Sequence, residues 1–413
     1  MIWEVFGMRK ILLTGIMLAC LTGCSPRTVD ENAVTHLRVW VGDNADVAWM
    51  EQVIRDFEAA NPSQSYDIQI GVQSEGDAAR VILADVESAA DVFTFADDQL
   101  PDLLLGGALM PLQENEEDII NRNTPESIAA ATSAEGQLCA YPATADNGYF
   151  LFYNSALITP EDAAAFESLL ERAAQNGRRV AFPMNNGWYL YSFFRGAGLE
   201  MRLSDDGVTN LCNWNAADTP ITGVQVLTAL LEIAQHPGFI SADSDAFVAG
   251  LKDGSIIAGV SGTWNAAVAA QVWGDDYAAA KLPTFRAADQ DVQMASFSGF
   301  KLVGVNPYSG NTGAAFDLAS FMTDYEAQLD RFRLRRQGPS NVAALASAEV
   351  QSEPAIAAII AQAPYADVQR VGSKYWDAAA SLGKIIASGN PSGADFQTLL
   401  DNAVAGITAP AGQ

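Results

Sequence analysis

The sequence predicts a chain with more than one α/β domain, and three observations support this prediction. The 413 residues amount to about three times a typical domain of roughly 150 residues. Hydrophobic residues make up 49% of the chain and charged residues 18%, which supports a buried core and excludes a disordered or fibrous chain. Short apolar runs typical of strands alternate with longer segments of helical periodicity. Such alternation is typical of sheets covered by helices.

The N-terminal part shows the order strand, helix, strand, helix, strand. The strands are expected at 36–41, 66–72 and 91–95, and the helices at 47–57 and 77–89. Asp46 can cap the first helix, because a carboxylate accepts hydrogen bonds from the free amides of a helix start. This order favours a mainly parallel, doubly wound sheet. Such sheets bind ligands beyond the carboxyl ends of their strands, so we expect a site at the turns 42–46 and 96–99.

A second α/β section follows the apolar segment 149–153. Further strands are expected at 179–183, 255–260 and 298–305. Further helices are expected at 161–176, 220–235, 243–252, 311–323, 325–334, 353–362, 374–388 and 393–406. The composition changes little along the chain, so it does not by itself place a boundary between domains.

The charge and the cysteines limit the partners of the chain. Lys and Arg number 23 and Asp and Glu 50, so the formal net charge is −27, and nucleic acids and anionic lipid surfaces would be repelled as main ligands. The 2 histidines, and 4 cysteines without a C-x-x-C spacing, argue against a metal site. No cofactor is expected. Cys139 and Cys212 could form a disulfide or stay as two buried thiols, and the sequence leaves both interpretations open.

The N-terminus has the organisation of an export signal. Arg9 and Lys10 precede an apolar run over 11–21. This run suits a signal peptide and is too short for the roughly 20 residues of a membrane-spanning helix. It ends in Leu-Thr-Gly-Cys at 21–24, which resembles the bacterial lipobox.

Processing at this motif would produce a lipoprotein. We expect a signal peptide over 1–23, a lipid such as palmitate on the thiol of Cys24, and a polar tether over 24–33. The lipid would hold the protein outside the cytoplasm on the bacterial cell membrane. An ordinary signal peptide cut nearby and a short N-terminal anchor are the alternatives.

Several segments of the mature chain share motifs, in order, with one known family. They include Gly-Gly-Ala-Leu-Met-Pro-Leu and Gly-Val-Ser-Gly-Thr-Trp, and they lie at 37–43, 90–98, 106–112, 136–142, 145–149, 153–154, 182–188, 259–264, 282–285 and 375–376. In these segments the chain resembles the maltose/maltodextrin-binding type (family 1) of the extracellular solute-binding proteins of bacterial ABC sugar importers. The resemblance runs from about residue 36 to residue 408.

The resemblance implies a two-lobed α/β fold of the periplasmic-binding-protein kind, with a hinge and a cleft between the lobes. One lobe would comprise 34–145 plus 300–348, and the other 149–296 plus 352–413. The hinge segments would lie near 146–149, 296–300 and 346–352.

The resemblance also implies which residues bind the ligand. A sugar offers flat C–H patches and a rim of hydroxyls, so its site needs aromatic faces and fixed polar groups. Gln99 stands where the family carries an arginine, and Ala45 where it often carries a lysine. The corresponding positions lie in turns, at the hinge, in a polar–aromatic loop at 186–189 and near two later tryptophans, and they are Asp43, Asn44, Phe95, Asp98, Gln99, Asp146, Asn147, Asn186, Trp188, Tyr189, Trp264 and Trp376.

The implied function is binding of a sugar in the cleft and its delivery to the transmembrane subunits of an ABC permease, by a monomer without catalytic residues. Three alternatives stay open. A glycoside hydrolase would use two carboxylates, for which Asp98 and Asp146 are the obvious pair. A surface glycan-binding lipoprotein would bind sugar without transport. A receptor for a non-sugar solute, such as a peptide, would use the same fold.

Overall fold

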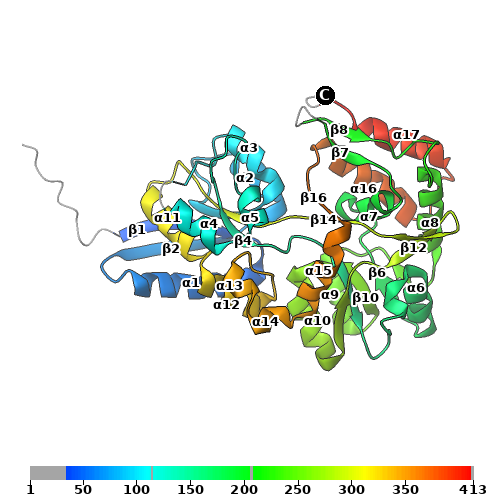
Figure 1. Ribbon diagram of the computed structural model, residues 1–413, viewed down its shortest axis with the longest axis horizontal. Helices are drawn as coiled ribbons and strands as arrows, with labels where there is room; N and C mark the ends of the chain where they lie inside the picture. Colours follow the sequence, from blue (N-terminus) through cyan, green and yellow to red (C-terminus); the bar gives the residue numbers. More distant parts are fainter. Residues whose placement is uncertain (1–33, 113–114, 205–207, 411–413) are drawn as a thin grey trace, which may run out of the picture.

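The computed structural model describes residues 34–112, 115–204 and 208–410. These residues form two α/β lobes that lie side by side along the longest axis of the molecule (Figure 1). The predicted signal peptide, the lipobox with Cys24 and the tether lie outside the described residues. Among the residues described, no helix is both long and apolar enough to cross a membrane.

The first lobe is built on a five-stranded sheet with the order β2-β1-β3-β15-β4. Its strands are β1 (Val34–Val41), β2 (Ser65–Val72), β3 (Val92–Ala96), β4 (Tyr141–Thr144) and β15 (Lys301–Val305). β1 pairs in parallel with β2 and β3, as the strand–helix order predicts. β15 is antiparallel to β3 and β4. The chain returns from the other lobe to the edge at which β4 ends, so β15 runs in the opposite direction and needs no crossover helix.

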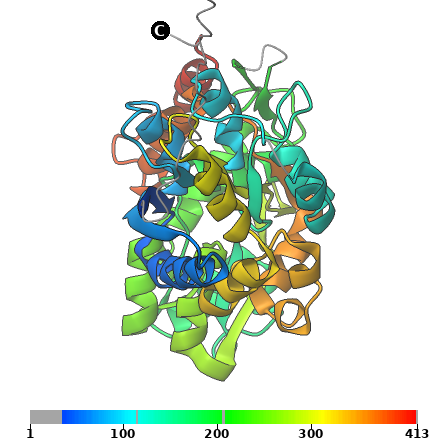
Figure 2. The same ribbon diagram turned by 90° about the vertical axis from the view of Figure 1, so that its left-hand side faces the viewer.

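Helices cover both faces of this sheet and bury its apolar side chains. Figure 2 looks onto this lobe from its outer end, with α1 in blue beside the yellow helices of the returning chain. Val39, Val41 and Phe93 of the sheet and Phe57 of α1 are among its buried core. The helices are α1 (Val47–Ala60), α2 (Ala78–Ile82), α3 (Leu100–Leu105), α4 (Glu116–Arg122), α5 (Pro125–Ala130), α11 (Thr312–Phe321) and α12 (Tyr325–Arg335).

The second lobe has its own five-stranded sheet, with the order β11-β5-β10-β6-β9. Its strands are β5 (Phe150–Asn154), β6 (Arg179–Ala181), β9 (Phe239–Ile240), β10 (Ile256–Ser261) and β11 (Tyr277–Ala280). Three small pairs flank it: β7 (Met201–Leu203) with β8 (Asn210–Cys212), β12 (Thr284–Ala287) with β13 (Gln290–Gln293), and β14 (Ser296–Ser298) with β16 (Ala366–Val368). The helices are α6 (Phe166–Gln175), α7 (Gly187–Gly196), α8 (Gly223–Gln235), α9 (Ser244–Asp253), α10 (Ala266–Trp273), α15 (Pro354–Gln362), α16 (Lys374–Ala387) and α17 (Phe396–Ile407).

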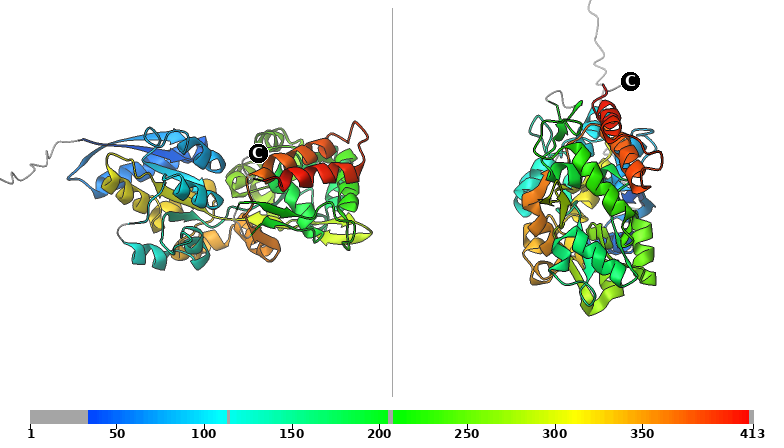
Figure 3. Two further views of the ribbon diagram at one scale, coloured as in Figure 1. Left: turned by 90° about the horizontal axis from the view of Figure 1, so that it is seen from above. Right: turned by 90° about the vertical axis from the view of Figure 1, so that its right-hand side faces the viewer.

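The chain passes between the two lobes more than once, as the view from above in Figure 3 shows. It crosses from β4 to β5, returns from β14 to β15, and crosses again through α13 (Val342–Leu345) and α14 (Ala348–Gln351) to α15. Because β15 lies between β3 and β4, the first sheet contains two separate parts of the chain.

Two expectations about local structure are wrong. The helix predicted over 77–89 ends after Ile82. Asp85 accepts hydrogen bonds from the amide and the hydroxyl of Ser88, and such a local turn competes with helix. The polar–aromatic loop predicted at 186–189 is the start of α7, with Asn186 as its N-cap.

Cys139 and Cys212 do not form a disulfide. Cys139 belongs to the core of the first lobe and Cys212 to a strand of the second, and both thiols are free. The interpretation as two unpaired thiols is therefore confirmed, and Cys139 is buried as expected, whereas Cys212 is only half-buried.

Candidate functional site

A cleft of about 750 Å³ lies between the lobes, a volume typical of small-molecule sites. The first lobe lines it with the turns that follow β1, β2 and β3 and with the start of β15: Gly42, Asp43, Ser74, Glu75, Gly76, Asp77, Arg80, Ala96, Asp98, Gln99 and Lys301. The second lobe and the crossing segments contribute Asn147, Asn186, Trp188, Tyr189, Trp264, Gln369, Ser373, Trp376 and Asp377. The turns at 42–46 and 96–99 thus meet at one edge of the sheet, as predicted.

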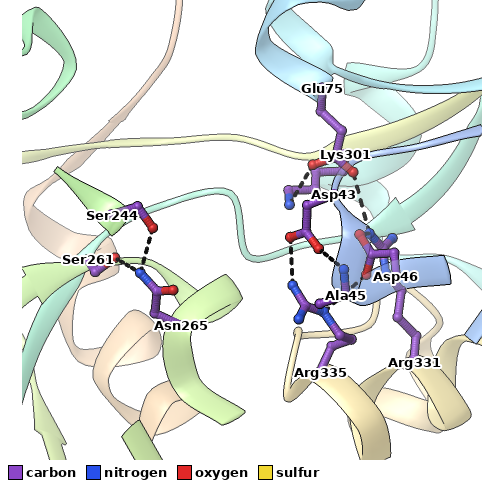
Figure 4. A network of polar contacts seen from close by, with 10 residues as sticks. All are labelled: Asp43, Ala45, Asp46, Glu75, Ser244, Ser261, Asn265, Lys301, Arg331 and Arg335. Carbon is purple, nitrogen blue, oxygen red and sulfur yellow. Dashed lines mark hydrogen bonds and ion pairs between the residues drawn. The ribbon is translucent and has the colours of Figure 1, made fainter. Parts of the chain in front are cut away.

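A buried network of charges supports the first-lobe wall (Figure 4). The Nζ of Lys301 lies 2.6 Å from Glu75 Oε2. Arg331 of α12 reaches both Glu75, at 3.4 Å, and Asp46, at 3.5 Å. Burial raises the pKa of Asp46, but Arg331 and the neighbouring cations outweigh this effect, so the pKa is lowered. The wall is therefore an ionised, preorganised surface.

Arg335 links this network to the turn after β1. Its Nη2 lies 2.7 Å from Asp43 Oδ2, and its Nε lies 3.1 Å from Asp46 Oδ1. The other oxygen of Asp43 accepts a hydrogen bond from the amide of Ala45 at 2.6 Å. Asp43 therefore lines the cleft with a carboxylate that already has partners.

Aromatic rings form the second-lobe wall. Trp188 lies in the first turn of α7, and its backbone amide donates a hydrogen bond of 2.9 Å to Asn186 Oδ1. The indole of Trp188 packs against Tyr149, Tyr189 and Trp264, with centroid distances of 4.6, 5.1 and 5.8 Å. Locked rings of this kind can offer a flat apolar platform to a ligand.

Trp264 is held by its neighbours on the second lobe and faces the first. The next residue, Asn265, donates hydrogen bonds of 2.9 Å to the hydroxyls of Ser244 and Ser261 (Figure 4, left). This fixes the short 3-10 turn Thr263–Asn265 that carries the indole. From the opposite lobe, Lys301 Nζ lies 5.6 Å from the centroid of the Trp264 ring, within range of a cation–π contact.

Asp98 is an acceptor without a full set of partners. Its Oδ1 is buried and has no hydrogen-bond partner among the described residues. Burial, and then repulsion by Asp97, raise the pKa of Asp98 to about 7, against a hydrogen bond from Gln369 and the charge of Arg370. A ligand hydroxyl could supply the missing donor.

Substituting Asp98 by asparagine is expected to change how stability depends on pH. The folded pKa of about 7 exceeds the ordinary value of 3.8, so the folded protein retains a proton that the unfolded chain releases. The stability that Asp98 contributes is therefore present below pH 3.8 and is lost as the pH rises to about 7. The free energy of unfolding of Asp98→Asn, relative to that of wild type, should therefore rise as the pH increases from 3.8 to about 7. Urea unfolding at several pH values measures it. A difference that does not vary with pH would contradict this.

The structure brings most of the predicted residues to the cleft. Residues in its lining are Asp43, Asp98, Gln99, Asn147, Asn186, Trp188, Tyr189, Trp264 and Trp376. The amide of Gln99 is already engaged, since its Oε1 accepts from the Ala79 amide at 2.7 Å and its Nε2 donates to the Glu75 carbonyl at 2.6 Å. Gln99 therefore supports the neighbouring turn.

Three predicted residues are not in the cleft lining. Phe95 points into the first core, fully buried beside Phe93, because side chains alternate along β3. Asn44 is exposed next to the cleft. Asp146 is buried in the crossing segment, where it accepts a hydrogen bond from the Gly338 amide. The carboxylate pair Asp98 and Asp146 that a glycoside hydrolase would need is thus not assembled there.

Several polar residues of the cleft were not predicted. Glu75 lies in the 3-10 turn before α2, and Arg80 lies in α2 itself. Lys301 begins β15, and Gln369 follows β16. Lys301 and Arg80 lie in segments for which a strand and a helix are predicted, but nothing in the local pattern indicates that their side chains reach the cleft, so only the fold brings these residues together. Among the residues described, no group of acidic, histidine or cysteine side chains could hold a metal ion.

Known proteins share this architecture. The profile described as bacterial extracellular solute-binding protein matches residues 52–358. A protein solved with acarbose is 27% identical, with a TM-score of 0.79, and the match covers 91% of this chain and 99% of that one. Maltodextrin-binding protein MalE1 from L. casei BL23, solved without ligand, is 25% identical, with a TM-score of 0.73 and coverage of 92% and 100%.

A more distant structure shows the same fold. The maltose/maltodextrin-binding domain MalE from Bdellovibrio bacteriovorus, bound to maltotriose, is 18% identical, with a TM-score of 0.76 and coverage of 90% and 98%. No curated protein matches the chain significantly. The profile match spans more than half of the chain and includes parts of both lobes. The chain therefore belongs to the bacterial extracellular solute-binding proteins.

Proposed function

We propose that this protein binds a sugar, an oligosaccharide of the maltodextrin kind or a similar chain, in the cleft between its lobes. The observation that carries this proposal is that Trp188, Trp264 and Trp376 line the same cleft as Asp98, whose Oδ1 has no donor among the described residues. Indole faces suit the C–H patches of a sugar, and a carboxylate oxygen suits its hydroxyls. The protein would act by binding alone, without catalysis.

The similar structures support the same ligand class. The relative that is 27% identical was solved with acarbose, and the one that is 25% identical is a maltodextrin-binding protein. Gln99 hydrogen-bonds within its own lobe. The cations in the cleft lining, Lys301 and Arg80, are paired with Glu75 and Asp77. The sugar that binds here would therefore meet a pattern of charges different from the arginine and lysine of the family pattern.

Binding would favour closure of the lobes around the ligand. We place the hinges at 146–149, 296–300 and 346–352, between lobes of 34–145 plus 300–348 and 149–296 plus 352–413. A sugar that contacts both lobes binds the closed form more tightly than the open form. It therefore shifts the equilibrium toward the closed form, to an extent set by the difference between the two affinities.

Delivery to an ABC permease would complete the function. The protein belongs to an extracellular family, so it acts outside the cytoplasm. A lipid on Cys24 would hold the monomeric receptor near the transmembrane subunits and raise its effective concentration there. Replacing Cys24 by alanine would then release the protein from the membrane fraction.

A thermal-shift measurement tests the ligand class. The mature protein is heated with maltose, maltotriose, maltotetraose, other oligosaccharides and short peptides. A ligand that binds only the native state stabilises it by about 2.7 kcal/mol at 100 times its Kd. We expect the midpoint to rise with oligosaccharides.

The other outcomes decide between the alternatives. A folded sample that shifts with peptides and not with sugars would overturn the proposal and favour a peptide receptor. Release of reducing sugar from a bound oligosaccharide would favour a hydrolase. Sugar binding without stimulation of the ATPase activity of a candidate ABC permease would favour a surface glycan-binding lipoprotein.

A further inference from the structure

Lys301 lies at the start of β15, where this strand enters the first lobe and borders the cleft (Figure 4). Its Nζ forms an ion pair of 2.6 Å with Glu75 Oε2, and its side chain is only 8% exposed. The carboxylate of Glu75 packs against Gly42, since a Cβ at residue 42 would come within 2.6 Å of the carboxyl carbon. The ammonium of Lys301 is therefore held in one place on the first-lobe wall.

Trp264 is held in a similar way on the second lobe. Its indole folds back over Gly262, where a Cβ would come within 2.1 Å of the ring. Asn265 fixes the turn that carries the indole through its hydrogen bonds to two serine hydroxyls. Lys301 Nζ of the first lobe lies 5.6 Å from the centroid of this ring. Two fixed groups from different lobes therefore meet inside the cleft.

The ion pair with Glu75 leaves hydrogen-bond donors on Lys301. An ammonium carries three N–H groups and no acceptor, and Glu75 is the one acidic partner of Lys301 among the residues described. A sugar unit that stacks on Trp264 from the side of the first lobe lies within reach of Nζ, because this atom is 5.6 Å from the ring centroid. The rim of such a unit consists of hydroxyls, which accept hydrogen bonds.

The second cation of the cleft lining, Arg80, is less suited to this contact. It pairs with Asp77, three residues earlier in the chain, and the two side chains are 74% and 53% exposed. Exposed pairs of this kind contribute little, because water screens them and their side chains lose conformational freedom when they are held. Lys301 is already ordered before a ligand arrives, so its contact with a ligand costs less conformational entropy.

We propose that Lys301 contacts the bound sugar and donates a charge-assisted hydrogen bond to a hydroxyl of the unit that stacks on Trp264. This inference rests on the proposed function. The same sugar unit then touches an indole of the second lobe and an ammonium of the first. Lys301 thereby selects ligands that place an acceptor beside the stacked face, and it adds to their affinity because charge-assisted hydrogen bonds are stronger than neutral ones.

Replacing Lys301 by methionine tests the contact. Lys301→Met keeps the side-chain length and removes the ammonium, and Glu75 keeps its ion pair with Arg331. We expect maltotriose to bind this variant about tenfold more weakly in calorimetry. The matched control is Lys281→Met, because Lys281 Nζ also lies over a ring, 5.2 Å from the centroid of Tyr365, but neither residue lines the cleft. Its affinity should equal that of wild type.

Maltotriose analogues that each lack one hydroxyl separate a hydrogen bond from a general effect on the wall. One analogue should bind wild type about tenfold more weakly than maltotriose does, yet bind Lys301→Met as well as maltotriose does, because the partner of the missing hydroxyl is already gone. Lys301→Gln, whose amide can still donate to Glu75, replaces the methionine variant if melting curves show that the latter does not fold. Equal losses for every analogue in both proteins, or affinity for maltotriose in the variant that equals or exceeds that of wild type, would overturn the inference.

A measurement without ligand keeps this inference separate from the proposed function. The charge of Lys301 acts on the Trp264 ring, so tryptophan emission of the free protein should differ between wild type and Lys301→Met, and this difference should disappear when both carry Trp264→Phe. If wild type binds no sugar but the difference is present, the proposed ligand is wrong and the subsite shared by the two lobes stands. If wild type binds maltotriose and Lys301→Met binds it equally well, the ligand class stands and the role of Lys301 does not.

Discussion

Alanine in place of Trp264 is expected to weaken binding of the cognate oligosaccharide about 5- to 150-fold, or roughly 1–3 kcal/mol. The indole lines the cleft, packs 5.8 Å from the Trp188 ring and lies under the Nζ of Lys301 at 5.6 Å. Removing it deletes a stacking face and also exposes a cation that the ring now shields. Trp188→Ala should have an effect of the same size, because the two rings form one surface.

Calorimetric titration with maltotriose, beside a melting curve of each variant, measures this effect. The control is Tyr308→Ala, an aromatic residue that is 53% exposed and outside the cleft lining, and its affinity should not change. Unaltered affinity in both tryptophan variants, with their folds intact, would remove the assignment of the aromatic wall.

Methionine in place of Arg331 is expected to lower the free energy of unfolding by about 3–5 kcal/mol, as when one partner of a buried ion pair is removed. The side chain is 3% exposed and pairs with Asp46 and Glu75. Its guanidinium also lies 5.0 Å from the centroid of the Trp49 ring. Methionine refills part of the volume but leaves two buried carboxylates short of positive charge. Urea unfolding at neutral pH measures the loss.

The chain offers a matched control on the same helix. Arg333 also pairs with two acids, Asp330 and Glu349, but its side chain is 49% exposed. Exposed pairs contribute little because water and salt screen them, so Arg333→Met should cost much less than Arg331→Met. Equal losses in the two variants would mean that burial of the network does not govern its contribution.

A place in the cleft could be predicted for residues in the turns that directly follow a strand. The turn after β3 carries Asp98 and the turn after β1 carries Asp43, and both lie at the cleft, because parallel strands end at one edge of their sheet. Trp264 is a similar case, since it follows the end of β10. Strand order indicated the two turns, and the family resemblance singled out Asp43, Asp98 and Trp264.

The cleft residues that were not predicted depend on tertiary contacts that no local pattern contains. Lys301 reaches the cleft only because β15 returns from the second lobe, and Gln369 only because β16 pairs with β14. Phe95 and Asp98 are close in sequence, but the side chain of Phe95 lies in the core and that of Asp98 at the cleft. In α7, aromatic and aliphatic residues are buried on all sides, so its helical period is not visible in the sequence.

The late entry of β15 has a consequence for how the protein is made. About 150 residues separate Thr144 from Lys301, and at 5–20 residues per second their synthesis takes roughly 8–30 s. During that time β3 and β4 lack the strand that pairs with both, so the first lobe cannot complete its sheet. The first lobe of a nascent chain can therefore reach its final fold only after β15 has been synthesised. Such a delay suits a polypeptide that must be threaded through a secretion channel before it folds.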